Sequence, residues 1–195
     1  MTTTGNEKTY IVMDLEMNNS GTRFLSEKNG IMLGAEIIEF GAVKLDGDLN
    51  QIDEYCRFVK PTAYPKVNNE VRELTGITTK QIWEGELFPD VVREFLDWCG
   101  EDAVFITWSV NDINVLEDNM LYHGMDIEQL PLCYDIQLMF DDQVTNEGRD
   151  FALSYAMWKY GITPARSHDA LNDAINTAEV FRRLDLSEGL DEYEI

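Results

Sequence analysis

The sequence is poor in positive charge, histidine and cysteine, and it contains no long hydrophobic run. Fifteen Lys and Arg residues face 37 Asp and Glu residues in 195, so the formal net charge is −22. Between residues 94 and 148 there are 13 acids and no Lys or Arg. Proteins that grip long polyanions usually carry a basic stripe, and this chain cannot rely on one. The acids either form a solvated surface that serves solubility, or some of them hold cations.

Other absences narrow the class of protein. No stretch approaches 18 uncharged apolar residues, which excludes a transmembrane helix. We therefore expect no membrane partner. The polar N-terminal segment Met1–Lys8 lacks the apolar run of a signal peptide. Cys56, Cys99 and Cys133 lie far apart, without the spacing of a zinc site or a redox pair, and predict reduced thiols. Together these features predict a cytoplasmic protein.

The remaining composition is that of a folded domain. With 44% hydrophobic and 11% aromatic residues, the chain can bury a sizeable core. Repeats, linkers and low-complexity tracts are absent from the sequence, so we predict one domain over residues 1–195, with a core at about 8–184. The acidic segment Asp185–Ile195 has five acids and no base, and we expect a loose tail there.

The hydrophobic pattern predicts strands first and helices later. Thr9–Met13, Ala35–Leu45 and Glu54–Val59 read as three strands of an antiparallel meander. A buried strand at Ala103–Trp108 and several helical patterns follow, the latter at Asn68–Leu74, Pro89–Cys99, Asp112–Tyr122, Tyr134–Phe140, Phe151–Tyr160 and Ala170–Leu184. This order predicts an α/β fold with a mixed sheet, in which an antiparallel meander is joined by parallel strands and flanked by helices.

Two acids close the first strand. Asp14 and Glu16 lie two residues apart, so their side chains share one face of the strand, with Cα atoms roughly 7 Å apart. Both can converge on one hard cation, which prefers carboxylate oxygen. The alternative is a strand-end pair that faces water. The apolar run Tyr10–Met13 favours the first interpretation, because it aims the pair at the edge of the sheet.

Asp112 follows the buried strand Ala103–Trp108 at a strand-to-helix switch, where α/β sheets usually have their sites. Asp is also a preferred helix N-cap residue, and Asp112 could be that alone.

His168 and Asp173 bracket the start of the last helix. On one helix they would diverge by about 140°, so they can face one cleft only if His168 comes from the preceding loop at residues 163–167. His123, the only other histidine, sits beside Gly124 at a helix C-terminus, where a cation is favoured for structural reasons. A histidine near its unperturbed pKa can take a proton from water at neutral pH, while carboxylates hold two divalent ions that stabilise a phosphodiester transition state.

These residues, in this order, resemble the DEDD superfamily of 3′→5′ exonucleases, with its ribonuclease H-like fold, over about Lys8 to Leu184. The first motif is matched by Asp14-Leu-Glu16, the second by Asn111-Asp112 and the third by the segment from His168 to Asp173. One branch of the superfamily has tyrosine four residues before the final aspartate. Asp169 stands there in this chain, which is thereby identified as a member of the histidine (DEDDh) branch.

The resemblance implies roles for each matched residue. Asp14, Glu16 and Asp173 would bind one Mg²⁺ or Mn²⁺ ion, with Asp14 bridging to a second ion that Asp112 supports. His168 would be the general base. Contacts to the substrate are implied at three further residues, Met17, Ile77 and Trp108. Ile77 and Trp108 could stack on or wedge the terminal bases, and the alternative for both is an ordinary core position. Many relatives have a small pair such as Thr-Gly, contacting the terminal sugar, where this chain has Met17-Asn18.

A finer similarity concerns Glu36–Gly41, Glu73–Thr78 and Thr107-Trp108. These segments are similar to exoribonucleases that trim histone-message and small-RNA 3′ ends, and to bacterial relatives of the sporulation-inhibitor type. They imply single-stranded 3′ ends as substrates, RNA favoured over DNA, and nucleoside 5′-monophosphates as products.

Two other functions remain open: a proofreading exonuclease of a DNA polymerase, and a non-catalytic acidic interaction module that keeps the fold. Adaptation of the protein to high salt is a third possibility, but it would explain only the negative net charge and not the motifs.

Overall fold

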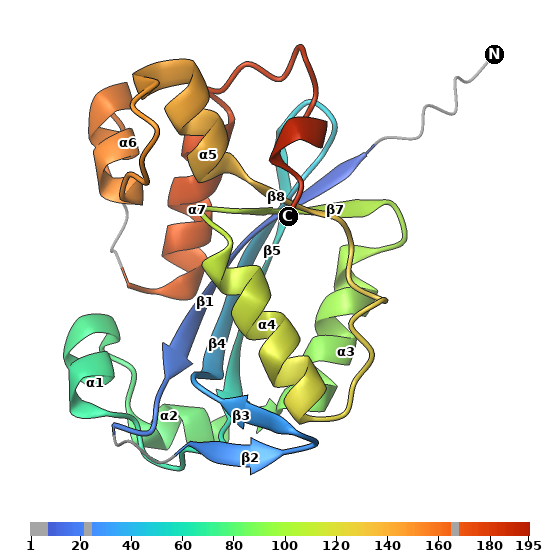
Figure 1. Cartoon of the computed structure of the whole chain (residues 1–195), viewed down its shortest axis with the longest axis vertical. Helices are drawn as coiled ribbons and strands as arrows, with labels where there is room; N and C mark the ends of the chain where they lie inside the picture. Colours follow the sequence, from blue (N-terminus) through green and yellow to red (C-terminus); the bar gives the residue numbers. More distant parts are fainter. Residues whose placement is uncertain (1–7, 22–24, 165–167) are drawn as a thin grey trace.

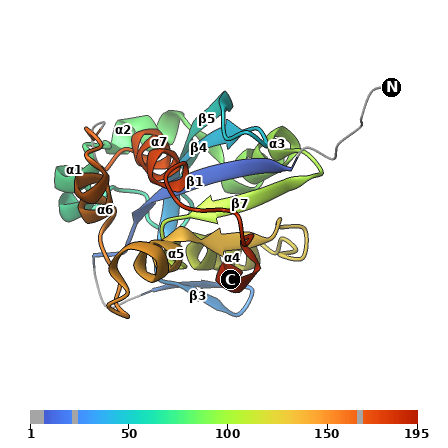
Figure 2. The same ribbon diagram turned by 90° about the horizontal axis from the view of Figure 1, so that it is seen from above.

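The computed structural model describes residues 8–21, 25–164 and 168–195. Its centre is a six-stranded sheet in the order β6-β5-β4-β1-β7-β8, with helices on both faces (Figures 1 and 2). The strands of this sheet are β1 (Thr9–Asn18), β4 (Glu36–Leu45), β5 (Gln51–Lys60), β6 (Glu86–Leu87), β7 (Ala103–Thr107) and β8 (Cys133–Asp135). A separate hairpin joins β2 (Ser26–Lys28) to β3 (Ile31–Leu33).

The helices are α1 (Asn69–Thr75), α2 (Thr79–Glu84), α3 (Phe88–Cys99), α4 (Asn111–Tyr122), α5 (Ile136–Phe140), α6 (Leu153–Tyr160) and α7 (Ala170–Phe181). A π-helical turn spans Asp141–Thr145, and a 3₁₀ turn spans Asp191–Tyr193. No helix within the described ranges is long and apolar enough to cross a membrane.

The sheet confirms the predicted mixed topology. β1 pairs antiparallel with β4, and β4 pairs antiparallel with β5, which is the expected meander. β7 then runs parallel to β1, and β8 runs parallel to β7. The central place of β1 follows from its nearly continuous apolar sequence, because a strand covered on both faces needs apolar residues on both.

Alternation along β1 divides the core into two layers. Ile11, Met13 and Leu15 pack with residues of α3 and α4, whereas Val12 packs with residues of α5, α6 and α7. Asp14 lies two residues after Val12 and therefore on the same face of the strand, so its side chain points toward the face that α7 covers. The sheet thereby directs the first acidic residue toward the last long helix.

Two expectations were wrong. The segment Tyr134–Phe140 was predicted as helix, but Tyr134 belongs to β8 and the helix begins only at Ile136, after Asp135 caps it through Gln137 N (2.8 Å). Only three residues form this strand, too few for an alternating pattern to show in the sequence.

The C-terminal segment is not a loose tail. Leu190 is buried, Glu194 pairs antiparallel with Tyr134, and the Ile195 N–H donates to the Cys133 carbonyl at 2.9 Å. The backbone of β8 at the edge of the sheet offers free hydrogen-bonding groups, and the last residues satisfy some of them.

Candidate active site

Asp14 and Glu16 lie on the central strand of the sheet. In the pairing with β4, Asp14 is opposite Gly41 and Glu16 is opposite Glu39. The register shifts between Glu16 and Met17, a β-bulge that changes the course of the strand just after the second acid. The shared face of the two acids matches the expectation from the sequence, and the strand that carries them lies inside the sheet rather than at its edge.

Asp112 contacts β1 directly. Val110, not Asp112, is the N-cap residue of α4, so Asp112 lies inside the first turn. Its Oδ1 accepts a hydrogen bond of 3.1 Å from the backbone N–H of Leu15, and the side chain is buried. The simple capping role is therefore excluded, and α4 delivers this carboxylate to the backbone between Asp14 and Glu16.

His168 comes from the loop before α7, as the helical geometry required. Asp169 is the N-cap of α7 and accepts from Asn172 N at 3.1 Å, which leaves His168 outside the helix. His168 has φ of 61°, and its backbone N–H donates to Oδ2 of Asp173 at 2.6 Å. This left-handed residue turns the chain so that the histidine and Asp173 reach one site. Of the preceding loop, residues 165–167 lie outside the described residues.

A cavity of about 450 Å³ joins these residues, within the range of pockets that bury a small ligand. It is lined by Asp14, Leu15, Glu16, Met17, Trp108, Ser109, Asn111, Asp112, Ala152, Leu153, Ser154, Met157, His168 and Asp173. The five predicted catalytic residues are all included, together with Met17 and Trp108. No Lys or Arg is among the described residues that line it.

Ile77 is not brought to this cavity. It is buried in a small cluster with Ile38, Val67 and Ile82, so it packs as a core residue, one of the two alternatives that the sequence left open. Trp108 is also nearly buried, and its indole N–H donates to the Phe151 carbonyl at 3.0 Å, which fixes the ring at the cavity wall.

The carboxylates hold their protons more tightly than usual. Burial, followed by the charges of Asp112 and Asp173, raises the pKa of Asp14 well above its usual value. Burial and the charge of Asp173 raise the pKa of Glu16 to about 8. Burial also raises the pKa of Asp112 to about 7, although the Leu15 N–H opposes the shift. No Lys or Arg among the described lining residues offsets this buried negative charge, and a divalent cation would relieve it.

The donor set suits such a cation. Glu16, His168 and Asp173 each offer a ligand atom, and these atoms lie within 4.8 Å of one another. Carboxylate oxygens suit hard divalent ions, and imidazole is tolerated by Mn²⁺ and other transition ions. The residues present therefore fit a divalent metal.

A fifth carboxylate, which the sequence analysis did not single out, lies beside the site. Glu39 is buried, accepts from Ala170 N at 3.4 Å and contacts the Cys56 thiol at 3.7 Å. Its pKa is raised chiefly by burial. An acid in the middle of the apolar segment 37–43 was the available signal. Glu39 contacts the first residue of α7, the helix that carries Asp173.

His123 lies elsewhere. It caps the C-terminus of α4 and stacks on Phe88, with ring centroids 5.0 Å apart. Burial lowers its pKa, as does the nearby charge of Lys28. His123 is thus a structural residue, in agreement with the interpretation favoured from the sequence.

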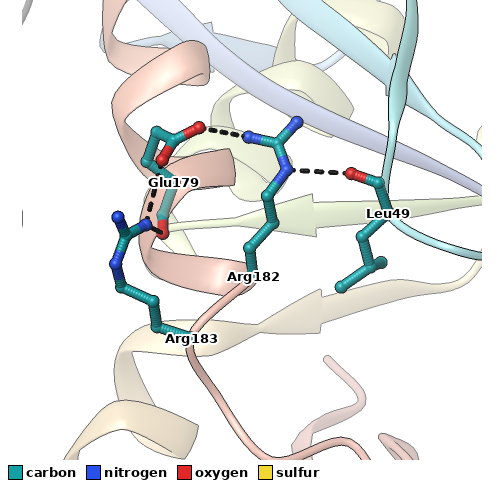
Figure 3. A network of polar contacts seen from close by, with 4 residues as sticks. All are labelled: Leu49, Glu179, Arg182 and Arg183. Carbon is teal, nitrogen blue, oxygen red and sulfur yellow. Dashed lines mark hydrogen bonds and ion pairs between the residues drawn. The ribbon is translucent and has the colours of Figure 1, made fainter.

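Many of the cations are paired with acids. Arg57, Lys80, Arg93 and Arg149 each form an ion pair, with Glu94, Glu84, Asp90 and Glu147 respectively. At the end of α7, Glu179 binds both Arg182 and Arg183, and Arg182 Nε also donates to the Leu49 carbonyl at 2.8 Å (Figure 3). These side chains are partly neutralised within the protein, which reduces their availability to a polyanion.

Comparison with known proteins places the chain among nucleases. Residues 11–181 match the RNase_T exonuclease family. A probable 3′-5′ exonuclease, KapD of Bacillus subtilis, is 28% identical over 153 residues, which are 75% of this chain and 72% of KapD. The PolC-type DNA polymerase III of Thermotoga maritima is 29% identical over 184 residues, 91% of this chain but only 12% of the polymerase.

The fold also matches solved nucleases. The nuclease domain of 3′hExo, a DEDDh family member bound to rAMP, superimposes with a TM-score of 0.78 at 21% identity. The alignment covers 97% of this chain and 96% of that domain. This agreement confirms the ribonuclease H-like architecture that the order of strands and helices indicated.

Proposed function

The chain belongs to the RNase_T exonuclease family and is a 3′-5′ exonuclease, and from this premise we propose that it hydrolyses single-stranded 3′ ends, RNA in preference to DNA. The products would be nucleoside 5′-monophosphates. The observation that carries the proposal is the convergence of Asp14, Glu16, Asp112, Asp173 and His168 on one cavity.

The proposed cofactor is a pair of divalent ions, Mg²⁺ or Mn²⁺. Glu16 and Asp173 would hold the first ion together with Asp14, which would also contact the second, and Asp112 would support the second. When bound, such ions supply positive charge to the attacking and leaving oxygens of the phosphodiester. The raised pKa values of Glu16 and Asp112 support this assignment, because a bound cation would stabilise the carboxylate anions that burial disfavours.

His168 is proposed as the general base that takes the proton of the attacking water. It is exposed at the cavity, and its backbone is fixed through the bond to Asp173. A water between the imidazole and the phosphate would lose its proton to a ring nitrogen, and the proton would then leave to solvent. Since His168 also belongs to the group that could hold an ion, its variant must be tested for metal binding as well as for rate.

The lining of the cavity supports an unpaired strand end as the substrate. Besides its acids, the cavity is lined by the apolar and aromatic side chains of Met17, Trp108, Leu153 and Met157. Apolar and aromatic side chains pack on base faces, which are accessible only when the base is unpaired. The preference for RNA rests on the similarity to RNA-trimming exonucleases and on the likeness to a fold solved with rAMP.

A proofreading exonuclease is the second candidate function. The similarity to a PolC-type DNA polymerase III over 91% of this chain favours it. A proofreading enzyme acts on DNA, so the preferred sugar of the substrate separates the two candidates.

The decisive experiment is digestion of matched 5′-labelled RNA and DNA, single- and double-stranded, with Mg²⁺ or Mn²⁺. We expect a ladder that shortens from the 3′ end, fastest for single-stranded RNA. Excess EDTA and the Asp14→Ala variant should each remove nearly all turnover. Faster digestion of DNA would support proofreading, whereas robust hydrolysis in EDTA would refute the metal-dependent mechanism.

A further inference from the structure

Trp158 on α6 is the most exposed of the large apolar side chains in the described part of the chain, at 72%. Single exposed apolar residues are ordinary on protein surfaces, so exposure alone indicates no function. The position of this tryptophan beside the catalytic cavity makes it distinctive.

Helix α6 forms one wall of the cavity through Leu153, Ser154 and Met157. Trp158 follows Met157 directly and stands four residues after Ser154, so it is rotated by only about 40° from Ser154 around the helix. The indole therefore lies on the flank of α6 that continues from the cavity, one turn farther along. Beside it, Lys159 is exposed and adds positive charge to an otherwise acidic protein.

A row of rings supports Trp158 from one side. The centroid of Tyr155 lies 5.7 Å from that of Trp158, and Tyr155 in turn stacks on Phe151 at 4.7 Å with an interplanar angle of 22°. The Arg149 guanidinium lies 4.5 Å from the centre of the Phe151 ring. These contacts restrict the rings, so a ligand that stacks on Trp158 would lose little side-chain entropy.

We infer that Trp158 is a stacking platform for a base upstream of the 3′-terminal nucleotide, a site that extends the proposed function and rests on it. The cavity holds only the end of a strand, and the rest must cross its rim. An exposed indole is sequence-tolerant, because every base has a π-face. The platform would bind single-stranded nucleic acid and contribute to substrate affinity without touching the reacting phosphate.

The test compares substrates of different length. The dinucleotide UpU occupies only the cavity, whereas a 20-nucleotide oligo(U) also crosses its rim. Trp158→Ala should raise KM for the 20-mer by about 5- to 30-fold with kcat unchanged, because stacking contributes uniform binding. The same variant should leave KM for UpU within about twofold. Trp158→Phe should retain most of the affinity.

Ile52→Ala is the matched control, since Ile52 is also an exposed apolar residue, at 58%. It lies on β5 next to Gln51, which pairs with Leu45 at the end of β4 that is far from Glu39. The variant should change KM for neither substrate. Equal effects of Trp158→Ala on both substrates, or no effect on either, would overturn the platform.

Binding gives a second measurement that does not depend on turnover. Fluorescence anisotropy of a labelled 20-mer would compare His168→Ala with His168→Ala/Trp158→Ala, both of which retain the carboxylates. We expect a 5- to 30-fold weaker Kd for the double variant, and an unchanged Kd overturns the inference. If the wild-type protein cleaves neither substrate but the double variant still binds more weakly, the proposed function fails and the platform stands.

Discussion

The backbone N–H of Leu15 donates a hydrogen bond to the Asp112 carboxylate across 97 residues of sequence. Leu15 lies between Asp14 and Glu16, so this bond holds the first turn of α4 against the acidic end of β1. The bond brings a negative charge toward two others, and the protein forms it although burial opposes the charge. Its geometry is set by the fold, while its electrostatic cost falls when a cation is bound.

Asp112→Asn should therefore change activity and stability in opposite directions. The amide oxygen can still accept from Leu15 N–H, but the charge is lost. We expect activity to fall by about 10- to 100-fold, as for other residues that support a metal ion, while Tm in EDTA rises. Steady-state rates and thermal melts would check this. A lower Tm in EDTA would show that the carboxylate stabilises the metal-free protein.

His168→Ala should reduce kcat by on the order of 10²–10⁴ if the imidazole is the general base. Metal affinity, measured by calorimetry, should change little. His123→Ala is the control, because His123 stacks on Phe88 away from the cavity, and its activity should be near that of the wild type. Equal losses from the two variants would contradict the assignment of the base.

Gly41→Ala should disrupt the site from a distance. A Cβ on Gly41 would lie 2.0 Å from the Ala170 carbonyl carbon and 2.2 Å from Leu171 N, so α7 would have to move. We expect a loss of about 3 kcal/mol in unfolding free energy, at the upper end for overpacked cores, and a marked loss of activity. Gly34→Ala is the control, since nothing lies within 4 Å of its Cβ. Denaturant melts measure the unfolding free energy of both variants. Wild-type stability of Gly41→Ala would contradict the close packing of Gly41 against α7.

The metal-free protein should lose stability as pH rises. The pKa of Glu16 is raised from 4.5 to about 8, and that of Asp112 from 3.8 to about 7, so the folded state holds more protons than the unfolded state between these values. Raising the pH from about 5 to 8 removes those protons and should lower Tm in EDTA. Saturating Mg²⁺ should weaken or reverse the trend, and a Tm in EDTA that rises over this range would argue against the raised pKa values.

Binding should depend weakly on salt. Only a few of the available cations can reach phosphates. These cations include Arg57, Lys60, Lys66, Arg72, Lys80, Arg93, Arg149 and Arg166, the last of which lies outside the described residues. Four of the described ones are paired with acids, so few counterions should be released. For single strands each phosphate contributes about 0.7 to the slope, and we expect a log–log slope of roughly 1–3. The measurement is titration of His168→Ala with KCl at fixed Mg²⁺, and a slope above about 5 would reveal a basic surface.

Short elements and contacts between distant residues could not be predicted from the sequence. The three residues of β8 and the pairing of Glu194 with Tyr134 carry no local period, because a strand this short is specified by its neighbours. The contribution of α6 to the cavity wall could not be predicted for another reason. Leu153 and Met157 fit an ordinary amphipathic helix, and nothing in their spacing tells which neighbour their side faces.

The sequence by itself determined the meander and the last helix, because strand alternation and helix caps act over a few residues. The acids were identified by the order of their motifs along the chain, which resembles that of the exonuclease superfamily. The sequence also required His168 to lie outside the helix, since helical rotation separates it from Asp173. The tertiary structure decided that Asp112 meets Leu15, that Ile77 is buried away from the cavity and that Gly41 lies against Ala170. These contacts join residues far apart in the chain, and they are set by how the sheet and helices pack rather than by any local preference.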